Sequence, residues 1–167
     1  ADSGSIGGDS SNEFMVLAES GEDDILYDDS SNYAANIEKA QSIIELKESG
    51  EEKLPKELVK TPHAKTIEDL ANFLNIPKEK TVKAVMLKEI TEDGENFVLE
   101  LIRGDLDVNS IKLKNAVGAK TELEMMTAED CEKFGIVPGY AGSYEKKEGL
   151  KVVIDETVKY VRNFALG

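Results

Sequence analysis

Lys83 is the residue whose setting first suggests chemistry, because it interrupts a strand that is otherwise apolar on both faces. The stretch 80–88 reads Lys-Thr-Val-Lys-Ala-Val-Met-Leu-Lys. A strand with two apolar faces is usually central in its sheet and covered on both sides. A buried ammonium group is unfavourable unless it is paired or faces a polar cavity. Lys83 therefore either extends to water from near the strand end or lines a pocket.

Two further features could share a pocket with Lys83. Residues 138–143 read Pro-Gly-Tyr-Ala-Gly-Ser, and Asp155 stands at the end of a predicted strand. Backbone N–H groups of a glycine-rich loop can approach a ligand closely and hold a carbonyl, a phosphate or a polarised water. Glycine pairs also make ordinary turns, and an aspartate after a strand also caps helices, so both interpretations stay open at this point.

The residue sets that usually carry catalysis are absent from the sequence. His63 is the single histidine, and its place between Pro62 and a predicted helix is typical of a solvated loop residue. No spacing of cysteine and histidine predicts a zinc site, and there is no Walker or dinucleotide-binding motif. We therefore expect no metal, and any hydrolysis must depend on positioning and electrostatics.

From residue 61 onward the pattern is that of a compact domain. Thr66 and Asp69 predict a capped helix that ends before Pro77. Asp93-Gly94 is expected to turn the Lys83 strand back into an antiparallel strand over 96–103.

The remaining elements are shorter. One helix is predicted from Asp107 or Asn109 to Gly118, and another begins at Thr127 with Asp130 three residues later. Further strands are predicted at 121–125, 151–154 and 164–166, with a turn or short helix over 156–161. We therefore expect a mixed α/β fold with a curved, largely antiparallel sheet and helices packed outside.

The first 60 residues have a different character. Residues 1–12 are rich in Ser, Gly and Asp, and the short apolar runs 13–18 and 25–27 suggest a hairpin. The stretch 33–46 has helical character, and 47–60 has the charged composition of a linker. The expected organisation is a poorly anchored segment over 1–46, a linker over 47–60 and a domain over 61–167.

Composition limits the classes of function. Lys and Arg total 20 against 34 Asp and Glu, which argues against indiscriminate binding to nucleic acid. Residues 61–167 hold 19 acidic and 15 basic residues, so a local basic patch is still possible there. The single Cys131 excludes an internal disulfide, and no apolar run is long enough to span a membrane. We expect a cytoplasmic protein, cut from a longer chain because it starts at Ala1 without methionine.

Two sets of residues resemble bacterial prolyl-tRNA synthetase. The stretch from Gly4 to Asp23, with Tyr33-Ala-Ala-Asn-Ile-Glu-Lys-Ala40, resembles the part of the class II catalytic domain that leads into an insertion. Residues 61–167 resemble the insertion itself, an editing domain related to free-standing deacylases. The motifs that carry this second resemblance are Thr61-Pro62, Lys65-Thr-Ile67, Glu79-Lys-Thr-Val-Lys83, Arg103-Gly-Asp105 with Asn109, Gly139 to Gly142, and Val153-Ile-Asp155.

The resemblance implies hydrolysis of alanine mischarged onto proline tRNA. It implies that Lys83 is needed for editing by holding the terminal adenosine or its phosphate, that Thr61 and Asp155 shape the pocket, and that Gly142 lies against the aminoacyl group. Catalysis is thereby expected from Lys83, Gly142 and Asp155. The expected substrate-binding residues are Thr61, Lys83, Gly139, Tyr140, Ala141, Gly142 and Ser143.

Three departures from the family pattern stand out. Ser143 replaces the proline that usually follows the loop glycine, and Asn12 replaces a histidine of the catalytic-domain segment. The family also continues beyond the position of Gly167 with a histidine implicated in alanine selectivity.

The resemblance also implies partners. These are the aminoacylated acceptor end of tRNA(Pro) and the rest of the synthetase in cis, as a homodimer at full length and with no membrane. No cofactor is expected for editing, since ATP and magnesium belong to the full-length ligase. Two alternatives stay open: a module that binds an aminoacyl-tRNA end without turnover, and a free-standing trans-acting deacylase.

Overall fold

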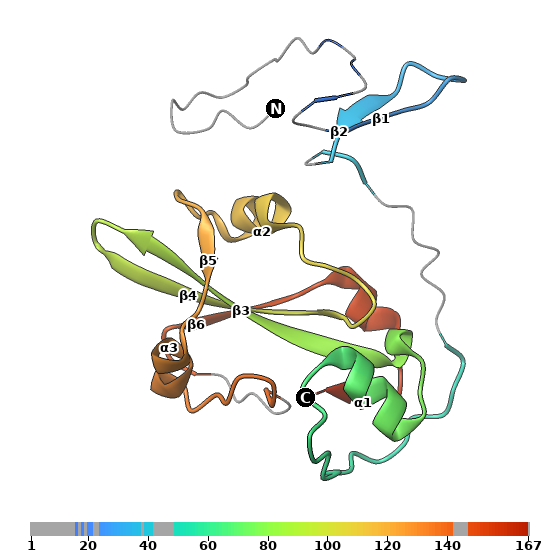
Figure 1. Cartoon of the computed structure of the whole chain (residues 1–167), viewed down its shortest axis with the longest axis vertical. Coiled ribbons are helices and arrows are strands. Elements are labelled where there is room, and N and C mark those ends of the chain that lie inside the picture. Colours follow the sequence, from blue (N-terminus) through green and yellow to red (C-terminus); the bar gives the residue numbers. More distant parts are fainter. Residues whose placement is uncertain are drawn as a thin grey trace. The chain divides into compact units, whose positions relative to one another are not determined.

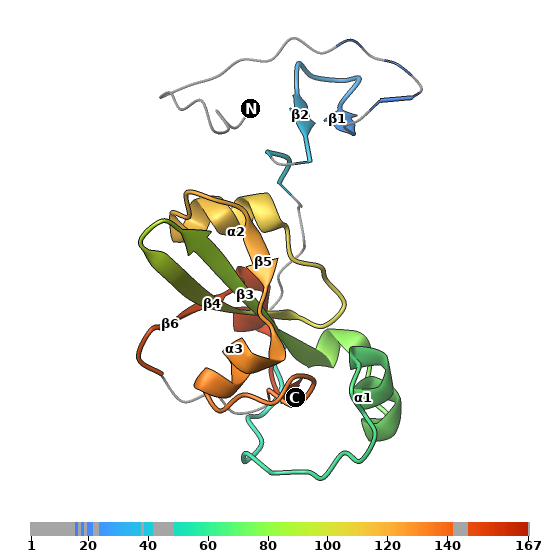
Figure 2. The same ribbon diagram turned by 60° about the vertical axis from the view of Figure 1, so that its left-hand side comes forward.

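The computed structural model describes residues 24–37, 39–41, 49–141 and 147–166, together with 16, 18, 20 and 21. The chain divides into two compact units, 1–44 and 45–167. The elements are drawn in Figures 1 and 2, and each unit is described by itself.

The first unit contains a short antiparallel hairpin of β1 (Ile25–Tyr27) and β2 (Ala34–Asn36). The strand expected at 25–27 is confirmed, and it pairs with β2. In the expected partner run 13–18, Val16 and Ala18 lie outside any strand, and 13–15 and 17 are outside the described residues. The helix expected over 33–46 is wrong at 34–36, and 42–46 are likewise outside the described residues.

A local turn explains the pairing of β1 with β2. The Asp28 carboxylate accepts hydrogen bonds from the Ser30 N–H at 3.0 Å and the Ser31 hydroxyl at 2.8 Å. An aspartate that binds the backbone two residues onward stabilises a turn. The chain therefore reverses directly after β1 and brings Ala34–Asn36 alongside it, which overrides the weak helical spacing.

The second unit is built on a five-stranded mixed sheet. Its centre is the antiparallel pair β3 (Thr81–Thr91) and β4 (Gly94–Arg103), in register from Val82↔Arg103 to Thr91↔Gly94. On the outer side of β3, β5 (Leu123–Met125) pairs antiparallel and β7 (Ala165–Leu166) pairs parallel. On the outer side of β4, β6 (Leu150–Ile154) pairs parallel. The largely antiparallel mixed α/β fold expected from the sequence is confirmed.

Three short α-helices begin where the sequence predicts caps. α1 (Ile67–Leu74) and α3 (Ala128–Lys133) each have a complete capping box, from Thr66 with Asp69 and from Thr127 with Asp130. α2 (Ser110–Val117) is capped by Asn109 and ends at Gly118, whose φ of 74° is left-handed. Two 3-10 helices, η2 (Lys78–Lys80) and η3 (Glu156–Tyr160), precede β3 and follow β6.

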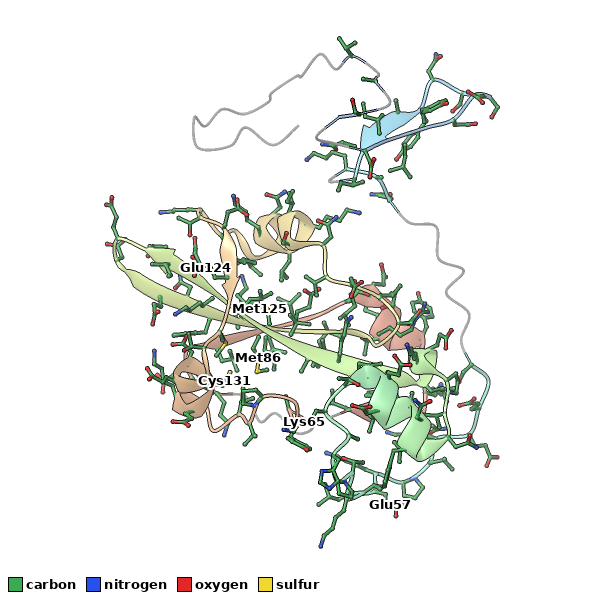
Figure 3. The ribbon with its side chains drawn as sticks, viewed as in Figure 1. Glu57, Lys65, Met86, Glu124, Met125 and Cys131 are labelled. Atoms are coloured by element: carbon green, nitrogen blue, oxygen red, sulfur yellow. The ribbon has the colours of Figure 1, made fainter. Side chains whose placement is uncertain are left out.

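Both faces of the β3–β4 pair are covered, as predicted for a central strand. Figure 1 shows α2 on one side of the hairpin and α3 on the other. On the α3 side, Met86 and Leu99 pack with Cys131, and Figure 3 shows the two sulfur-bearing side chains pointing toward one another. On the α2 side, Leu87 packs with Leu113. Close packing on both faces limits the movement of β3 and so fixes the starting positions of its side chains.

Residues 49–60 contain no helix or strand, yet part of this segment is anchored. Lys80 donates to the Glu51 carboxylate at 2.6 Å, and Asn163 donates to the same carboxylate at 3.2 Å. The Leu54 N–H donates to the Asn163 side chain at 2.9 Å. The segment with linker-like composition is thus tied to the beginning of β3 and to the residues before β7.

Candidate functional site

A small pocket lies at the outer edge of β3. Strand β7 pairs with β3 at Thr81–Val82 and β5 pairs with it at Leu87–Glu89, and the pocket adjoins the residues between these pairings. Its volume is about 110 Å³. The lining comes from the 61–66 segment, α1, β3 and the loop after α3, namely Thr61, Ala64, Lys65, Thr66, Ile67, Leu70, Lys83, Ala84, Gly139, Tyr140 and Ala141.

The structure thus places five of the predicted site residues around one pocket: Thr61, Lys83, Gly139, Tyr140 and Ala141. Gly142 and Ser143 lie outside the described residues. The lining residues come from three distant parts of the sequence, 61–70, 83–84 and 139–141, and Asp155 is not among them.

One wall of the pocket is the turn from Thr61 to Ala64. The Ala64 N–H donates to the Thr61 carbonyl at 3.3 Å, and His63 has a left-handed φ of 67°. Proline in the second position and a positive φ in the third are the features of a type II turn. Histidine tolerates this conformation better than most residues. His63 is exposed, as predicted for a loop residue, and it does not line the pocket.

A second turn of the same kind, from Val137 to Tyr140, also lines the pocket. The Tyr140 N–H donates to the Val137 carbonyl at 2.9 Å, and Gly139 has a φ of 80°. Pro138 and Gly139 therefore occupy the positions that a type II turn favours for them. The glycine-rich motif defines a fixed turn before residue 141, and the Tyr140 N–H is committed to that turn.

Lys83 extends from β3 on the α2 side of the sheet. Its ammonium donates to the Asp107 carboxylate at 2.8 Å, and the Lys83 side chain is 23% exposed whereas Asp107 is fully exposed. The Lys83 ammonium lowers the pKa of Asp107 through this hydrogen bond. An ion pair with such an exposed partner contributes little to stability, so an anionic group of a ligand could replace Asp107.

Asp155 has a structural task in this fold. Its carboxylate accepts from the Thr157 N–H at 2.9 Å and from the Thr157 hydroxyl, which caps η3. The Asp155 N–H donates to the Leu101 carbonyl at 2.8 Å, continuing the β4–β6 register by one residue. This register places Asp155 on the sheet face of Lys83, with Ile102 between them.

Glu100 is a charged residue that the sequence analysis missed. It lies in β4 opposite Val85 and Val153, is 7% exposed, and its Oε2 has no hydrogen-bond partner within the described part of the chain. Burial, reinforced by the negative charge of Asp155, raises the pKa of Glu100 to about 7. The available signal was a glutamate inside the apolar run 97–102.

The chemistry open to this pocket follows from its lining. Two of the lining residues are lysines and none is acidic, in a chain with a net charge of −14. Among the described residues, no cluster of His, Cys, Asp or Glu could hold a metal ion. None of the helices in that same part of the chain is long and apolar enough to cross a membrane. The two lysines and the small volume of the pocket together favour a small group attached to an anion.

The sequence of this chain is similar to part of several bacterial proline–tRNA ligases. A proline–tRNA ligase of Fusobacterium nucleatum is 51% identical over the whole chain, which covers 29% of the ligase. The ligases of Thermoanaerobacter sp. strain X514 and Trichlorobacter lovleyi are each 44% identical, with 29% and 28% of their length covered. The chain thus spans under a third of these relatives.

A solved structure, the crystal structure of hypothetical protein APE2540, is similar over 59% of this chain and 63% of its own. It has 19% sequence identity and a TM-score of 0.49. The family model for the aminoacyl-tRNA editing domain matches residues 61–167, which include every residue that lines the pocket. The chain therefore belongs to the aminoacyl-tRNA editing domain family.

Proposed function

We propose that this chain hydrolyses the ester bond of alanine mischarged onto tRNA(Pro), as the editing part of a proline–tRNA ligase. The observation that carries the proposal is a small pocket, with two lysines and no acidic residue in its lining, inside the region that matches the editing-domain family. Its volume of about 110 Å³ is far below the roughly 300–1,000 Å³ typical of pockets for drug-sized ligands.

Pocket size supports alanine as the preferred aminoacyl group. A rigid wall excludes a larger side chain more strongly than an apolar pocket separates two side chains that differ by one methylene. Both turn walls contain proline and a residue with positive φ, which limits their ability to yield. The proline ring is larger than the alanine methyl group, so we expect prolyl ester to be excluded.

The proposed mechanism relies on positioning. Lys83 holds the terminal adenosine or its phosphate, and backbone N–H groups of the 139–142 loop polarise the ester carbonyl or position a water molecule. The water oxygen attacks the carbonyl carbon, the ester C–O bond breaks, and a neighbouring ribose hydroxyl of the substrate assists transfer of the proton to the leaving oxygen. The Tyr140 N–H already donates to Val137, so the carbonyl donors must be its neighbours in the loop.

The partners in this proposal are the acceptor end of tRNA(Pro) and the rest of the ligase in cis, which forms a homodimer. The lining contains no histidine, cysteine or carboxylate that could act as nucleophile or base. This observation keeps a second function in view, a module that binds the aminoacyl-tRNA end without hydrolysing it.

The test is deacylation of alanyl-tRNA(Pro) and prolyl-tRNA(Pro) by this chain and by Lys83→Ala. We expect alanyl ester to be hydrolysed well above the spontaneous rate, prolyl ester to be spared, and the Lys83 variant to be about 10- to 100-fold slower, the loss of one charge-assisted hydrogen bond. Spontaneous loss of alanyl ester with both proteins, together with binding of the tRNA, would assign the chain to the binding function.

A further inference from the structure

The two lysines of the pocket differ in what their ammonium groups contact. Lys83 is hydrogen-bonded to Asp107 at 2.8 Å. The Lys65 side chain is exposed and makes no hydrogen bond or ion pair with any residue in the described part of the chain. Within that part, Lys65 is therefore the positive charge at the pocket that no carboxylate offsets.

The first atoms of the Lys65 side chain lie close to the glycine-containing turn. A Cβ atom built on Gly139 would lie 3.6 Å from the Lys65 carbonyl oxygen and 3.7 Å from its Cβ. Gly139 thus lies close to Lys65, and Figure 3 shows Lys65 beside this segment. On its other side Lys65 adjoins Thr66, the N-cap of α1. Lys65 therefore lies in the pocket lining next to Gly139.

Tyr140 supplies an aromatic ring at the same mouth. It lines the pocket, is 42% exposed, and directly follows Gly139 in the turn that its own N–H closes. An exposed aromatic ring offers a face on which a nucleic-acid base can stack. A cation next to such a ring provides a contact for the phosphate of the same nucleotide.

We propose that Lys65 and Tyr140 form a docking site for the terminal nucleotide of the RNA, in which the base stacks on Tyr140 and the 5′-phosphate binds Lys65. Its assignment to an aminoacylated RNA end rests on the proposed function. The two lysines then have different roles: Lys65 binds the phosphate, and Lys83 contacts the ribose that bears the ester. Lys65 and Tyr140 are positioning residues, and neither takes part in bond breaking.

The test uses two probes that need no hydrolysis, adenosine 5′-monophosphate and adenosine, with affinities measured by NMR titration of the full chain. We expect Lys65→Ala to weaken binding of the monophosphate about 10- to 100-fold and to leave adenosine unchanged. Tyr140→Ala is expected to weaken both probes about 5- to 100-fold, and Tyr140→Phe neither, because the ring is kept. Lys56→Ala, which removes an exposed lysine outside the pocket, is the matched control.

Equal monophosphate affinity for Lys65→Ala and Lys56→Ala, or no measurable binding to the unaltered chain, would overturn the proposal. Deacylation of alanyl-tRNA(Pro), measured in parallel, separates it from the proposed function. Hydrolysis with an unchanged KM in Lys65→Ala defeats the docking site alone. The expected nucleotide pattern without hydrolysis defeats the proposed function and supports the docking site.

Discussion

At the far end of β3, Lys88 pairs with both Glu95 and Asp130, whereas at the pocket end Lys83 pairs with Asp107. The Lys88 and Asp130 side chains are 12% and 5% exposed, but Asp107 is fully exposed. The difference separates two uses of charge in one strand. Buried and fully partnered groups stabilise the fold, while groups with exposed partners stay available to a ligand.

The hydrogen bonds around Glu89 and Glu100 repeat this contrast on the α2 side. Glu89 is buried and accepts from the Asn96 side chain at 2.9 Å and from the Thr121 N–H at 3.1 Å. Its pKa is lowered, first by the Asn96 hydrogen bond. Glu100 is equally buried, but its Oε2 is unsatisfied among the described residues and its pKa is raised. Glu100, whose carboxylate has the fewer hydrogen bonds, lies nearer to Lys83 along the sheet than Glu89 does.

The largest loss of stability is expected at the far end, from Asp130→Ala. The Asp130 carboxylate caps α3 and binds Lys88 and Lys133 at 2.9 Å each, so its loss leaves Lys88 with one partner fewer in a buried setting. The midpoint of thermal unfolding should fall by several degrees, while the deacylation rate per folded molecule stays unchanged. Glu129→Ala, with the same change of charge at an exposed position, should leave the midpoint nearly unaltered.

Gly104→Ala tests the junction at the start of β3. A Cβ there would overlap the buried Thr81 hydroxyl and lie 3.1 Å from the Lys78 carbonyl. Overpacking of this kind costs about 1–3 kcal/mol, to be measured by denaturant unfolding. Adding Thr81→Ala to this variant should recover part of the loss, and strict additivity of the two losses would exclude the overlap as the cause.

Glu100→Gln tests the unsatisfied carboxylate. The folded pKa of about 7 lies above the ordinary value of 4.5, so between these pH values the folded chain holds a proton that the unfolded chain has released. Stability contributed by this group therefore falls as the pH rises from about 4.5 to 7. The variant should match the parent at pH 4 and be more stable at pH 8 by roughly 1–3 kcal/mol. A constant difference between the two proteins from pH 4 to 8 would contradict this.

The smallest effect is expected from Asp107→Asn. This change removes the partner of Lys83 without altering the fold, because Asp107 is fully exposed and Asn109 caps α2. The KM for alanyl-tRNA(Pro) should fall at most about five-fold at low salt, and the difference should shrink as the salt concentration rises. An increase in KM would mean that Asp107 itself contacts the substrate.

The elements that sequence reasoning placed well are those with local causes. The capping boxes at Thr66 and Thr127, the turn between Thr91 and Gly94, which lies one residue earlier than predicted, and the Gly118 stop each depend on residues within four positions of one another. The helix predicted over 33–46 is wrong at 34–36, because the turn chemistry of Asp28 outweighed the spacing of small apolar residues.

Part of the pocket was predictable from the family resemblance. The resemblance brought Thr61, Lys83 and the 139–141 loop to one site, and the structure places them around one pocket. The Lys83 pairing with Asp107 and the burial of Glu100 were not predictable, because each depends on the register of β3 with β4 and on the path of the chain before α2. Such contacts join residues that no local pattern connects.

The different roles of Lys83 and Lys88 are tested most directly by measuring both the rate of alanyl-tRNA(Pro) deacylation and the unfolding midpoint for Lys83→Ala and Lys88→Ala. We expect Lys83→Ala to lose activity and keep its midpoint, and Lys88→Ala to lose several degrees of midpoint and keep its rate per folded molecule. Loss of stability and activity in proportion by both variants, or hydrolysis of the ester by Lys83→Ala at the parent rate, would contradict the separation of a ligand-binding lysine from a structural one.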